Sequence, residues 1–500
     1  MTIGRIARPG SGPHPGRLLV ATALLSGLLA ACGSRPAPNV LLVVIDTARA
    51  DRFSFDGYRR DTSPRIAALA REGAVYERAC TPAPWTLPAH ASLFTGLFPS
   101  RHGADSGHLR LDDDLPTLAE AFRGAGYRTL GYAANPWVGR QYRLDRGFDS
   151  YEEIWRQVHG EEEDAGATRL NARVDRWLTW RDGNQEARRQ PFFLFVNYLE
   201  PHLPYNPPEP ERSAFLTPPV DAAAVERLRR FKHPEEVRYI LGLTALAPGD
   251  LRILSDLYDG EIAYADRRVG ELVDLLRRRA LLDRTVVVIT SDHGEEIGEH
   301  GFLDHKMNVY DPLLRIPLVL RYPPAVPAGQ RIADPVMLQD LFPTLLGLAG
   351  IETPARAPRG ATAVGPREAV VLPGVRGLAT VSPRLGGGVA GAESTPPGGA
   401  EPIVAEFARP VQFLEVMREV VHGADLTPFE RTLVAWRSGD EKLHWSSDGR
   451  HRLYDLARDP AEENDLAPQH PERVAALAAQ VEAWLRRPVA RPPLAQPPRR

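Results

Sequence analysis

The chain has 500 residues, with 61 Lys and Arg against 64 Asp and Glu and a formal net charge of -3. This near balance excludes the basic composition typical of nucleic-acid-binding proteins, so no nucleic-acid partner is expected. Hydrophobic residues make up 43% and charged residues 25%, as in folded globular proteins, and the only two cysteines, Cys32 and Cys80, exclude a disulfide scaffold and a cysteine-rich metal site.

Residues 1–31 are predicted to be an export signal. The first 17 residues carry three arginines and no acidic residue, and an apolar run follows at 18–31. This run is too short to span a bilayer as a helix, but its length suits the core of a signal peptide. One interpretation is a general secretory signal cut near Ala31, with an incidental cysteine after it.

The end of the apolar run supports a second interpretation. Leu29-Ala30-Ala31-Cys32 resembles the lipobox of bacterial lipoproteins. The resemblance implies that Cys32 is lipidated, that residues 32–38 form a tether, and that a lipid anchor holds the protein at a membrane surface. Gly33, where Asp would retain a lipoprotein at the inner membrane, implies the outer membrane. We therefore expect an exported protein, lipid-anchored in the cell envelope at the outer membrane or on the periplasmic face.

Short aliphatic runs recur between residues 39 and 354 and predict buried strands. They lack polar alternation, which is typical of strands covered on both faces by helices in a largely parallel sheet. Ser63-Pro64 provides an N-cap and a first-turn proline for one helix, and apolar spacing predicts another at 258–279. The fold class is therefore α/β, with a large, mostly parallel sheet flanked by helices and an active site beyond the carboxyl ends of the strands. The expected strands are 40–45, 127–133, 192–196, 286–290 and 316–320.

The composition changes after the predicted catalytic domain at 39–354. Residues 355–402 are rich in Gly, Pro, Ala and Ser and are expected to form a loose insertion. Residues 403–486 return to an ordinary composition, end in a helical pattern at 474–485, and are predicted to be a smaller α+β subdomain. Residues 487–500 are rich in Pro and Arg and are predicted to be a flexible tail.

Polar side chains stand where two of the predicted strands end. Asp46 follows the strand at 40–45, and Asp292-His293 follows the strand at 286–290. Taken singly, an aspartate at a strand end is more often a turn or cap residue. Two carboxylates and an imidazole together are a plausible ligand set for one divalent cation.

Thr86 is the candidate nucleophile. Pro88, near the start of an apolar helical run, places Thr86 at a helix N-terminus. Unpaired N–H groups and the helix dipole attract an anion such as sulfate or phosphate there. A hydroxyl bound to a metal at that point would be an activated nucleophile. Taken alone, Thr86 is more simply explained as the helix cap.

Together, in chain order, these segments resemble the sulfatase family of the alkaline phosphatase superfamily. The segment at 39–46 resembles the opening strand with its metal aspartate, and 86–96 aligns without gaps to the signature Cys/Ser-x-Pro-x-Arg and its following Leu-Thr-Gly helix. The segment at 291–295 resembles the second metal segment, and 453–466 resembles the motif that closes the C-terminal subdomain. The resemblance spans most of residues 39–470 and implies a hydrolase of sulfuric esters that uses one divalent metal.

The chain departs from the family pattern at several positions. Thr86 stands where Cys or Ser is oxidised to formylglycine, and threonine is not a substrate for that oxidation. His90 replaces the supporting arginine, Thr47 the second aspartate and His293 an asparagine. Cys80 lies in a segment that mimics the modification motif out of register, so we do not expect it to be the nucleophile. An imidazole ligand favours Mn or Zn, whereas Ca, which prefers oxygen ligands, is possible by family resemblance.

The resemblance also implies roles for the residues around the metal. Thr86 attacks the ester, His90 hydrogen-bonds or helps to deprotonate it, and His202 or Lys306 protonates the departing alcohol. Arg49 either pairs with Asp51 or Asp56 or lines the anion pocket. Glu200, His202, His300 and His305 are further possible metal ligands without a fixed geometry. The predicted site is catalytic Thr86, His90 and His202; substrate-binding Lys306, His305 and Arg49; and metal-binding Asp46, Thr86, Asp292 and His293.

Three functions are compatible with these residues. The first is a metal-dependent sulfatase at the cell envelope, acting on an ester that is a glycan or a lipid. The second is a phosphodiesterase, phosphonate-ester hydrolase or phosphotransferase, because Thr86 and His293 also suit phosphorus chemistry. The third is a catalytically inactive lipoprotein that binds the envelope. Retention of all four metal-site residues disfavours the third, and bound divalent metal would discriminate it from the others.

Overall fold

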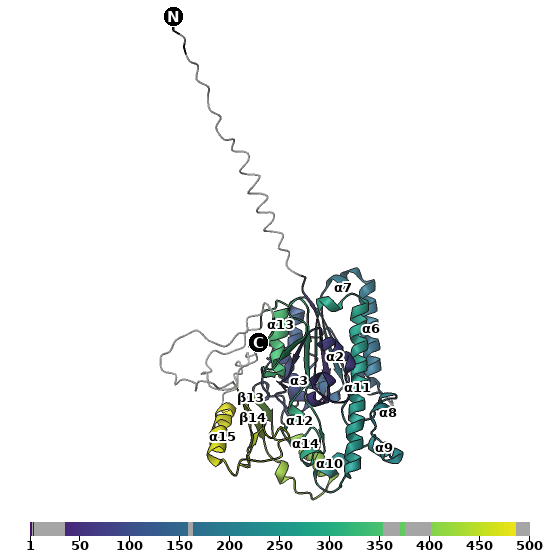
Figure 1. Cartoon of the computed structure of the whole chain (residues 1–500), viewed down its shortest axis with the longest axis vertical. Coiled ribbons are helices and arrows are strands. Elements are labelled where there is room, and N and C mark those ends of the chain that lie inside the picture. The colour runs from purple at the N-terminus through teal and green to yellow at the C-terminus, as the bar shows by residue number, and fades with distance from the viewer. Residues whose placement is uncertain (3, 5–35, 159–163, 354–370, 376–401, 487–500) are drawn as a thin grey trace, which may run out of the picture. The chain divides into compact units, whose positions relative to one another are not determined.

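A computed structural model describes residues 1–2, 4, 36–158, 164–353, 371–375 and 402–486 (Figure 1). Contacts divide the chain into Met1–Ala37 and Pro38–Arg500, and the second unit holds every helix and strand described below. Cys32, nearly all of the predicted signal, most of 355–402 and the tail at 487–500 lie outside the described residues. Within the described ranges, no helix has both the length and the hydropathy of a membrane span.

One eight-stranded sheet forms the centre of the second unit. β1 lies between β6 and β7 and runs parallel to both, while β10 is antiparallel to β7 and to β2. The predicted large, mostly parallel sheet is confirmed. In order across the sheet, the strands are β11 (Gln330–Ile332), β2 (Ala74–Tyr76), β10 (Leu318–Arg321), β7 (Thr285–Thr290), β1 (Asn39–Ile45), β6 (Phe192–Tyr198), β4 (Arg128–Ala133) and β5 (Ser150–Glu153).

The aliphatic sequence of β1 follows from burial on both faces. Val40, Leu42 and Val44 belong to one hydrophobic core, whereas Leu41 and Val43 belong to the other. Helices complete each core on its own side of the sheet. Both faces of β1 are therefore buried, which explains why its sequence does not alternate with polar residues. The first core contains residues of α3 (Thr86–Thr95), α5 (Leu118–Gly124) and α13 (Leu341–Leu348), and the second contains residues of α2 (Pro64–Ala70), α6 (Ala167–Gly183) and α11 (Pro248–Arg278).

Two helix starts differ from the sequence expectation. Ser63 does not cap α2 with its side chain; its Oγ accepts from Ser54 N at 2.9 Å instead. Asp266 of α11 takes that place, because its carboxylate accepts from Ile66 N at 2.7 Å. The helix α11 begins at Pro248 rather than at 258, since proline suits the first turn of a helix. Figure 1 shows this long helix beside α6.

The C-terminal residues form a second, four-stranded antiparallel sheet, in the order β13 (Ile403–Phe407), β14 (Leu433–Ser438), β15 (Glu441–Ser446) and β16 (Arg452–Asp455). Helices α14 (Val411–Val420) and α15 (Pro471–Leu485) accompany it, which confirms the α+β character of this region. Trp484 joins α15 to the sheet, because its Nε1 donates to Glu406 Oε1 at 2.6 Å. The predicted helix at 474–485 is therefore present and begins three positions earlier.

Shorter elements connect these layers. Segments that matter below are the 3-10 turns η3 (Pro136–Val138) and η4 (Arg140–Tyr142), the hairpin of β8 (Glu296–Ile297) with β9 (Leu303–Asp304), and α12 (Asp311–Leu314). Other short strands and helices are β3 (Ala79–Cys80), β12 (Val336–Met337), α4 (Pro99–His102), α7 (Gln185–Arg189), α8 (Glu211–Phe215), α9 (Ala222–Leu228) and α10 (Glu235–Ile240).

Candidate active site

The candidate site lies beyond the carboxyl ends of the central strands. Asp46 directly follows β1, and Asp292 and His293 follow β7, its parallel neighbour. Because parallel strands end at the same edge of a sheet, residues far apart in the sequence meet there. The ligand atoms of these three residues lie within 4.8 Å of one another, and all three side chains are buried.

Two asparagines hold the Asp46 carboxylate. Asn135 Nδ2 donates to Asp46 Oδ2 at 2.8 Å, and Asn197 Nδ2 donates to the same oxygen at 3.1 Å. The other oxygen, Oδ1, is buried without a hydrogen-bond partner. Burial raises the pKa of Asp46 despite these bonds. Neither asparagine was predicted as a site residue, although each stands at the end of a predicted strand, as Asp46 does.

In Asp292, as in Asp46, one carboxylate oxygen accepts hydrogen bonds and the other does not. Its Oδ1 accepts from His293 N at 3.0 Å and from Thr47 N at 3.2 Å, whereas its buried Oδ2 has no hydrogen-bond partner, and His90 Nδ1 lies 3.4 Å from it. Burial, and then the nearby charge of Asp46, raise the pKa of Asp292 well above its usual value. Two buried carboxylates with unpaired oxygens repel each other, and a cation between them would relieve that repulsion.

His293 presents a lone pair to this cluster. Its Nδ1 lies 2.9 Å from Gly294 O and therefore carries the ring hydrogen, which leaves Nε2 as an acceptor. This Nε2 lies 3.3 Å from Asp292 Oδ2, so two lone pairs converge. Burial is the main cause of a pKa well below the ordinary value for His293, which keeps the ring neutral. A neutral imidazole fixed by its other nitrogen is a good metal ligand.

Thr86 is the first residue of α3 and points into the cluster. Its Oγ1 lies 3.3 Å from His293 Nε2 and 3.4 Å from Asn135 Nδ2, the amide that also holds Asp46. The residue in the N-cap position is Trp85, and its side chain makes no capping bond. The interpretation of Thr86 as a helix cap is therefore wrong, because its hydroxyl contacts the candidate metal ligands instead.

His90 contacts the backbone of Thr86 rather than its hydroxyl. Its Nδ1 donates to the main-chain oxygen of Thr86 at 3.0 Å, one helical turn away. Burial lowers the pKa of His90 to about 4, and its Nε2 is buried without a partner. The expected hydrogen bond to the hydroxyl is thus replaced by a bond to the backbone, which positions the first turn of α3.

Comparison with known proteins identifies the family that this geometry belongs to. The family described as Sulfatase matches residues 38–351, which include every residue of the cluster. The chain belongs to the sulfatase family. It is 27% identical over 485 residues to a choline-sulfatase of Rhizobium meliloti, covering 88% of this chain and 85% of that protein. It is also 28% identical over 350 residues to arylsulfatase K of Xenopus laevis, covering 64% and 65% of the two chains.

Solved structures show the same fold. A phosphonate monoester hydrolase of Agrobacterium radiobacter matches with a TM-score of 0.66 and 24% identity, covering 90% of this chain and 95% of that one. A 2-O GAG sulfatase matches with a TM-score of 0.65 and 19% identity, covering 90% and 92%. The predicted fold, with a central sheet and a small C-terminal sheet, is therefore that of the sulfatase family.

Two further histidines lie beside the candidate metal ligands of this sulfatase-family chain. The His305 ring is 4.5 Å from the His293 ring and 5.0 Å from the His202 ring. His305 Nδ1 lies 2.6 Å from Asp304 Oδ1 and 3.2 Å from Glu295 Oε1, and these carboxylates raise the pKa of His305 to about 10 against the effect of burial. His202 Nδ1 donates to Leu203 O at 2.6 Å, and burial lowers its pKa.

Glu295, Asp304 and His305 form a second group of close ligand atoms, within 4.8 Å of one another. The sequence analysis named only His305 of the three. Lys306 also donates to Asp304, so two positive groups balance two carboxylates here. Of the other possible ligands, Glu200 accepts from Ala165 N at 3.0 Å, and His300 Nε2 lies 2.8 Å from Ala461 O; neither joins either group.

Arg49 and Cys80 lie outside the reaction centre. Arg49 pairs with Asp51 at 2.9 Å, as one alternative predicted, and with Glu299 at 2.6 Å. Both partners neutralise its guanidinium, so the predicted role of Arg49 in substrate binding is not supported, and Asp56 pairs with Arg315 instead. Cys80 is buried in β3, and burial raises the pKa of its thiol to about 11, which makes it a poor nucleophile.

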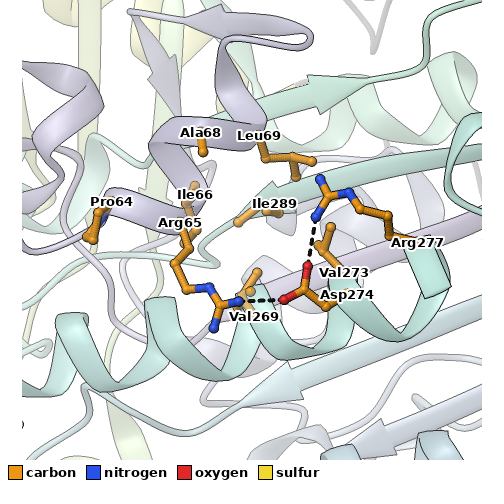
Figure 2. A pocket seen from close by; sticks show the side chains of 11 residues that line it. Pro64, Arg65, Ile66, Ala68, Leu69, Val269, Val273, Asp274, Arg277 and Ile289 are labelled. Atoms are coloured by element: carbon orange, nitrogen blue, oxygen red, sulfur yellow. Dashed lines mark hydrogen bonds and ion pairs between the residues drawn. The ribbon is translucent and has the colours of Figure 1, made fainter.

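A separate cavity of about 300 Å³ lies between α2 and α11 (Figure 2). Its lining combines the apolar side chains of Ile66, Leu69 and Val273 with the ion-paired side chains of Arg65, Asp274 and Arg277. None of the candidate catalytic or metal-binding residues lines it, so the reaction centre is defined by the converging side chains described above rather than by this cavity.

Proposed function

We propose that this sulfatase-family chain hydrolyses a sulfate ester with Thr86 as its nucleophile and with one divalent cation held by Asp46, Asp292 and His293. The observation that carries the proposal is the position of Thr86 Oγ1, 3.3 Å from His293 Nε2 and beside two carboxylates with unpaired buried oxygens. Family membership supports sulfate-ester hydrolysis, and the local geometry supports the choice of nucleophile.

The residues present fit a divalent cation. Asp46 Oδ1 and Asp292 Oδ2 are buried without partners, and His293 Nε2 offers a lone pair beside them. A mixed set of oxygen and nitrogen donors favours Mn or Zn over Ca. When bound, the cation supplies Lewis acidity to the reacting group.

Thr86 Oγ1 forms a bond to sulfur while the bond from sulfur to the ester oxygen breaks. The N-terminal N–H groups of α3 favour the negative charge of the sulfate group at this end of the helix. Water then attacks the sulfur of the Thr86 adduct, which releases sulfate and restores the hydroxyl. In the first half-reaction, in which the Thr86 adduct forms, the net proton transfer is from Thr86 to the departing alcohol.

Of the two candidate acids, Lys306 is the one that carries a proton to donate. His202 Nδ1 is engaged with Leu203 O, so its Nε2 is an acceptor rather than a donor. Lys306 carries a positive charge, and burial opposed by Asp304 leaves its pKa raised. We therefore assign proton acceptance to His202 and proton donation to Lys306.

The decisive experiment removes the hydroxyl of Thr86 by substitution. Thr86→Ala is expected to lower kcat for 4-nitrophenyl sulfate by roughly 10³-fold or more, whereas Thr86→Ser retains activity. Ser92→Ala is the matched control, because it removes another buried hydroxyl from α3. Full activity in Thr86→Ala would refute the assignment of the nucleophile.

His293 supports a second candidate function. A nitrogen ligand and a threonine nucleophile also suit phosphorus esters, and a phosphonate monoester hydrolase shares the fold. The chain would then be a phosphodiesterase, a phosphonate-ester hydrolase or a phosphotransferase. Ranking kcat/KM for an aryl sulfate, a phosphate monoester, a phosphodiester and a phosphonate ester, each with Ca, Mn and Zn, separates the two functions. A product carrying an added acceptor alcohol would identify transfer.

The location remains a proposal from the sequence. The lipobox-like segment before Cys32 supports a lipid anchor in the cell envelope, where an ester of a glycan or lipid would be the substrate. Cys32→Ser is expected to move the protein from the membrane fraction to the soluble fraction and to abolish labelling by a radioactive fatty acid. Membrane association that persists unchanged in this variant would contradict the anchor.

A further inference from the structure

We propose that the face of the second unit at the amino ends of the parallel strands lies on a membrane surface of anionic phospholipids, with the reaction centre turned away from it. We call this face the basic edge and define it as residues 123–128, 180–191 and 277–284. These three segments lead into β4, β6 and β7. The inference rests in part on the proposed lipid anchor, and it names the side from which the substrate arrives.

The three segments lie side by side at one end of the sheet. Gln190 Nε2 donates to Gly126 O at 2.9 Å, and Arg279 Nε donates to Asp182 Oδ2 at 3.0 Å, so the segments before β4 and β7 both contact the segment before β6. Since β4, β6, β1 and β7 run parallel, their amino ends meet here, and the reaction centre follows the opposite ends. The seven residues of β1 separate the two edges by about 20 Å.

The basic edge has an excess of positive charge that the protein does not neutralise. Its sequence contains nine arginines against three acidic residues. Asp182 and Asp283 already have arginine partners, Arg279 at 3.0 Å and Arg321 at 2.6 Å, so these two carboxylates do not offset the excess. Five exposed arginines of this edge have no carboxylate of the described residues within ion-pair distance: Arg123, Arg188, Arg189, Arg278 and Arg284.

The opposite edge of the sheet carries the reverse charge. Residues 292–304, which follow β7, contain five acidic residues and no arginine or lysine. An anionic surface therefore attracts the basic edge and repels the edge that carries Asp292. Clustered arginines beside an anionic bilayer add to the membrane binding that an acyl chain supplies, so charge is the term that orients an anchored chain.

Trp180 gives the basic edge an aromatic contact for lipid headgroups. Its side chain is 54% exposed, three positions before the end of α6. Tryptophan is enriched at the boundary between lipid and water, because its ring is apolar and its N–H is polar. Within the three segments, all of which the structure describes, Trp180 is the only exposed large apolar side chain. Unpaired arginines around one exposed tryptophan favour a headgroup layer over a protein partner, which would need a broader apolar surface.

The position of Asn39 brings this edge near the proposed anchor. β1 begins at Asn39, whose side chain accepts from Phe192 N at 3.3 Å and donates to Thr285 Oγ1 at 3.5 Å, at the starts of β6 and β7. Only six residues, 33–38, separate Cys32 from Asn39, and a chain of that length spans at most about 25 Å. A lipid on Cys32 would therefore keep the amino ends of these strands within that reach of the bilayer.

This orientation decides where the substrate comes from. With the basic edge on the bilayer, the length of β1 alone holds Asp46 and Thr86 about 20 Å from the membrane surface. An ester group in the headgroup layer of the same membrane is then out of reach. The substrate arrives from the aqueous phase.

Quenching by nitroxide-labelled lipids measures which edge lies near the bilayer. Cys80 is buried, so a fluorescent thiol reagent labels an introduced cysteine in the lipidated chain. Gln185→Cys places the label at the first residue of α7, and Leu243→Cys places it before α11, whose 31 residues span about 45 Å and end in the basic edge. On vesicles of phosphatidylglycerol and phosphatidylcholine, the label at 185 should lose most of its fluorescence and the label at 243 little. Equal quenching, or stronger quenching at 243, overturns the proposal.

Charge reversal tests the cause of this orientation. Arg188→Glu/Arg189→Glu should abolish the difference between the two labels, while the midpoint of thermal unfolding stays that of the wild type. Arg59→Glu/Arg458→Glu makes the same change in net charge at exposed arginines outside the basic edge and should keep the difference. Trp180→Glu should reduce quenching at 185 as well. A difference that Arg188→Glu/Arg189→Glu leaves unchanged overturns the role of the basic edge.

Mass analysis of Cys32 separates this inference from the proposed anchor. If Cys32 carries no lipid, the labelled Cys32→Ser chain is mixed with the same vesicles at low salt, where the attraction between charges is least screened. Quenching at 185 that disappears at high salt, and in vesicles of phosphatidylcholine alone, supports the basic edge even then. Absence of quenching at 185, or quenching that high salt leaves unchanged, overturns it, whatever ester the chain hydrolyses.

Discussion

Two buried polar regions of this molecule differ in how completely their charges are paired. At the reaction centre, Asp46 and Asp292 each keep one buried oxygen without a partner. Between α12 and the C-terminal sheet, Lys442 is only 1% exposed, yet its Nζ lies 2.6 Å from Asp311 and 2.8 Å from Glu462. His444 Nε2 adds a contact to Glu462 at 2.9 Å, and Arg437 Nη1 lies 3.7 Å from Asp311 Oδ2, so each carboxylate of this second region has a cationic partner within the protein.

The difference separates a structural network from a site that awaits a ligand. Burying a charge is costly unless it is paired, so a fully matched network needs nothing more and stabilises the junction of two segments. An unmatched pair of carboxylates is stable only when something else supplies the positive charge. The unpaired oxygens of Asp46 and Asp292 are therefore a better guide to function than the strongest ion pairs in the chain.

The largest expected effect comes from removing an unpaired carboxylate. Asp46→Asn should abolish stoichiometric binding of a divalent cation and lower activity by roughly 10³-fold or more, as should a chelator in the wild type. Metal analysis of the purified protein and recovery of activity with Mn or Zn check this outcome. Asp266→Asn, at a buried carboxylate that caps α2, should keep the metal; loss of metal there as well would remove the distinction between the two kinds of carboxylate.

Breaking the matched network should affect stability instead. Lys442→Met leaves Asp311 and Glu462 without their shared cation, which costs about 3–5 kcal/mol of unfolding free energy. Urea unfolding measures the loss, while the metal content of the folded fraction should remain that of the wild type. Lys232→Met, at an exposed lysine, should change stability little. A metal-free but fully stable Lys442→Met variant would contradict the structural role.

Glu200 provides an intermediate case, with one paired oxygen, one unpaired oxygen and no ligand cluster. Burial, and then the charge of Asp164, raise the pKa of Glu200 to about 7. Because the folded-state pKa is raised, the contribution of this group to stability is complete below about pH 4.5 and is lost as pH rises through 7. Glu200→Gln should therefore stabilise the chain at pH 8 by up to about 3 kcal/mol and leave it nearly unchanged at pH 4. Thermal unfolding of both proteins at the two pH values tests this, and an equal shift at both would exclude titration of Glu200 as the cause.

The smallest expected effect concerns a residue that supports a ligand. Asn135→Ala removes the 2.8 Å hydrogen bond to Asp46 and the contact with Thr86. Loss of such an outer partner should lower metal affinity about 10-fold. Titration of the metal-free protein with Mn measures the change. Asn184→Ala removes a comparable side chain that caps α7, and equal weakening in that variant would show that the effect is not local.

The central strands and the candidate metal ligands were predictable because their signals are local. An aliphatic run followed by Asp46, and another followed by Asp292-His293, mark strand ends in the sequence itself. The partners of these residues were not predictable in the same way. Asn135 and Asn197 resemble any polar residue at a strand end, and only the pairing of β4, β6 and β1 brings them to one carboxylate.

His90 and Arg49 show the same limit. His90 lies four residues after Thr86, a spacing that predicts proximity on a helix. Its imidazole nevertheless bonds to the backbone oxygen of Thr86 rather than to the hydroxyl. Arg49 donates a hydrogen bond to Glu299, which is 250 positions away in the sequence, because the loop after β1 packs against the segment after β8. Which carboxylate pairs with Arg49 depends on tertiary contacts, and these cannot be predicted from a local sequence pattern.

The strand order has a consequence for how such a protein can change. The candidate metal ligands follow β1 and β7 at the middle of the sheet, whereas the aromatic rings beside Trp85, those of Trp137 and Phe413, come from η3 and α14. Peripheral segments can therefore be exchanged between relatives without moving the atoms that perform the chemistry.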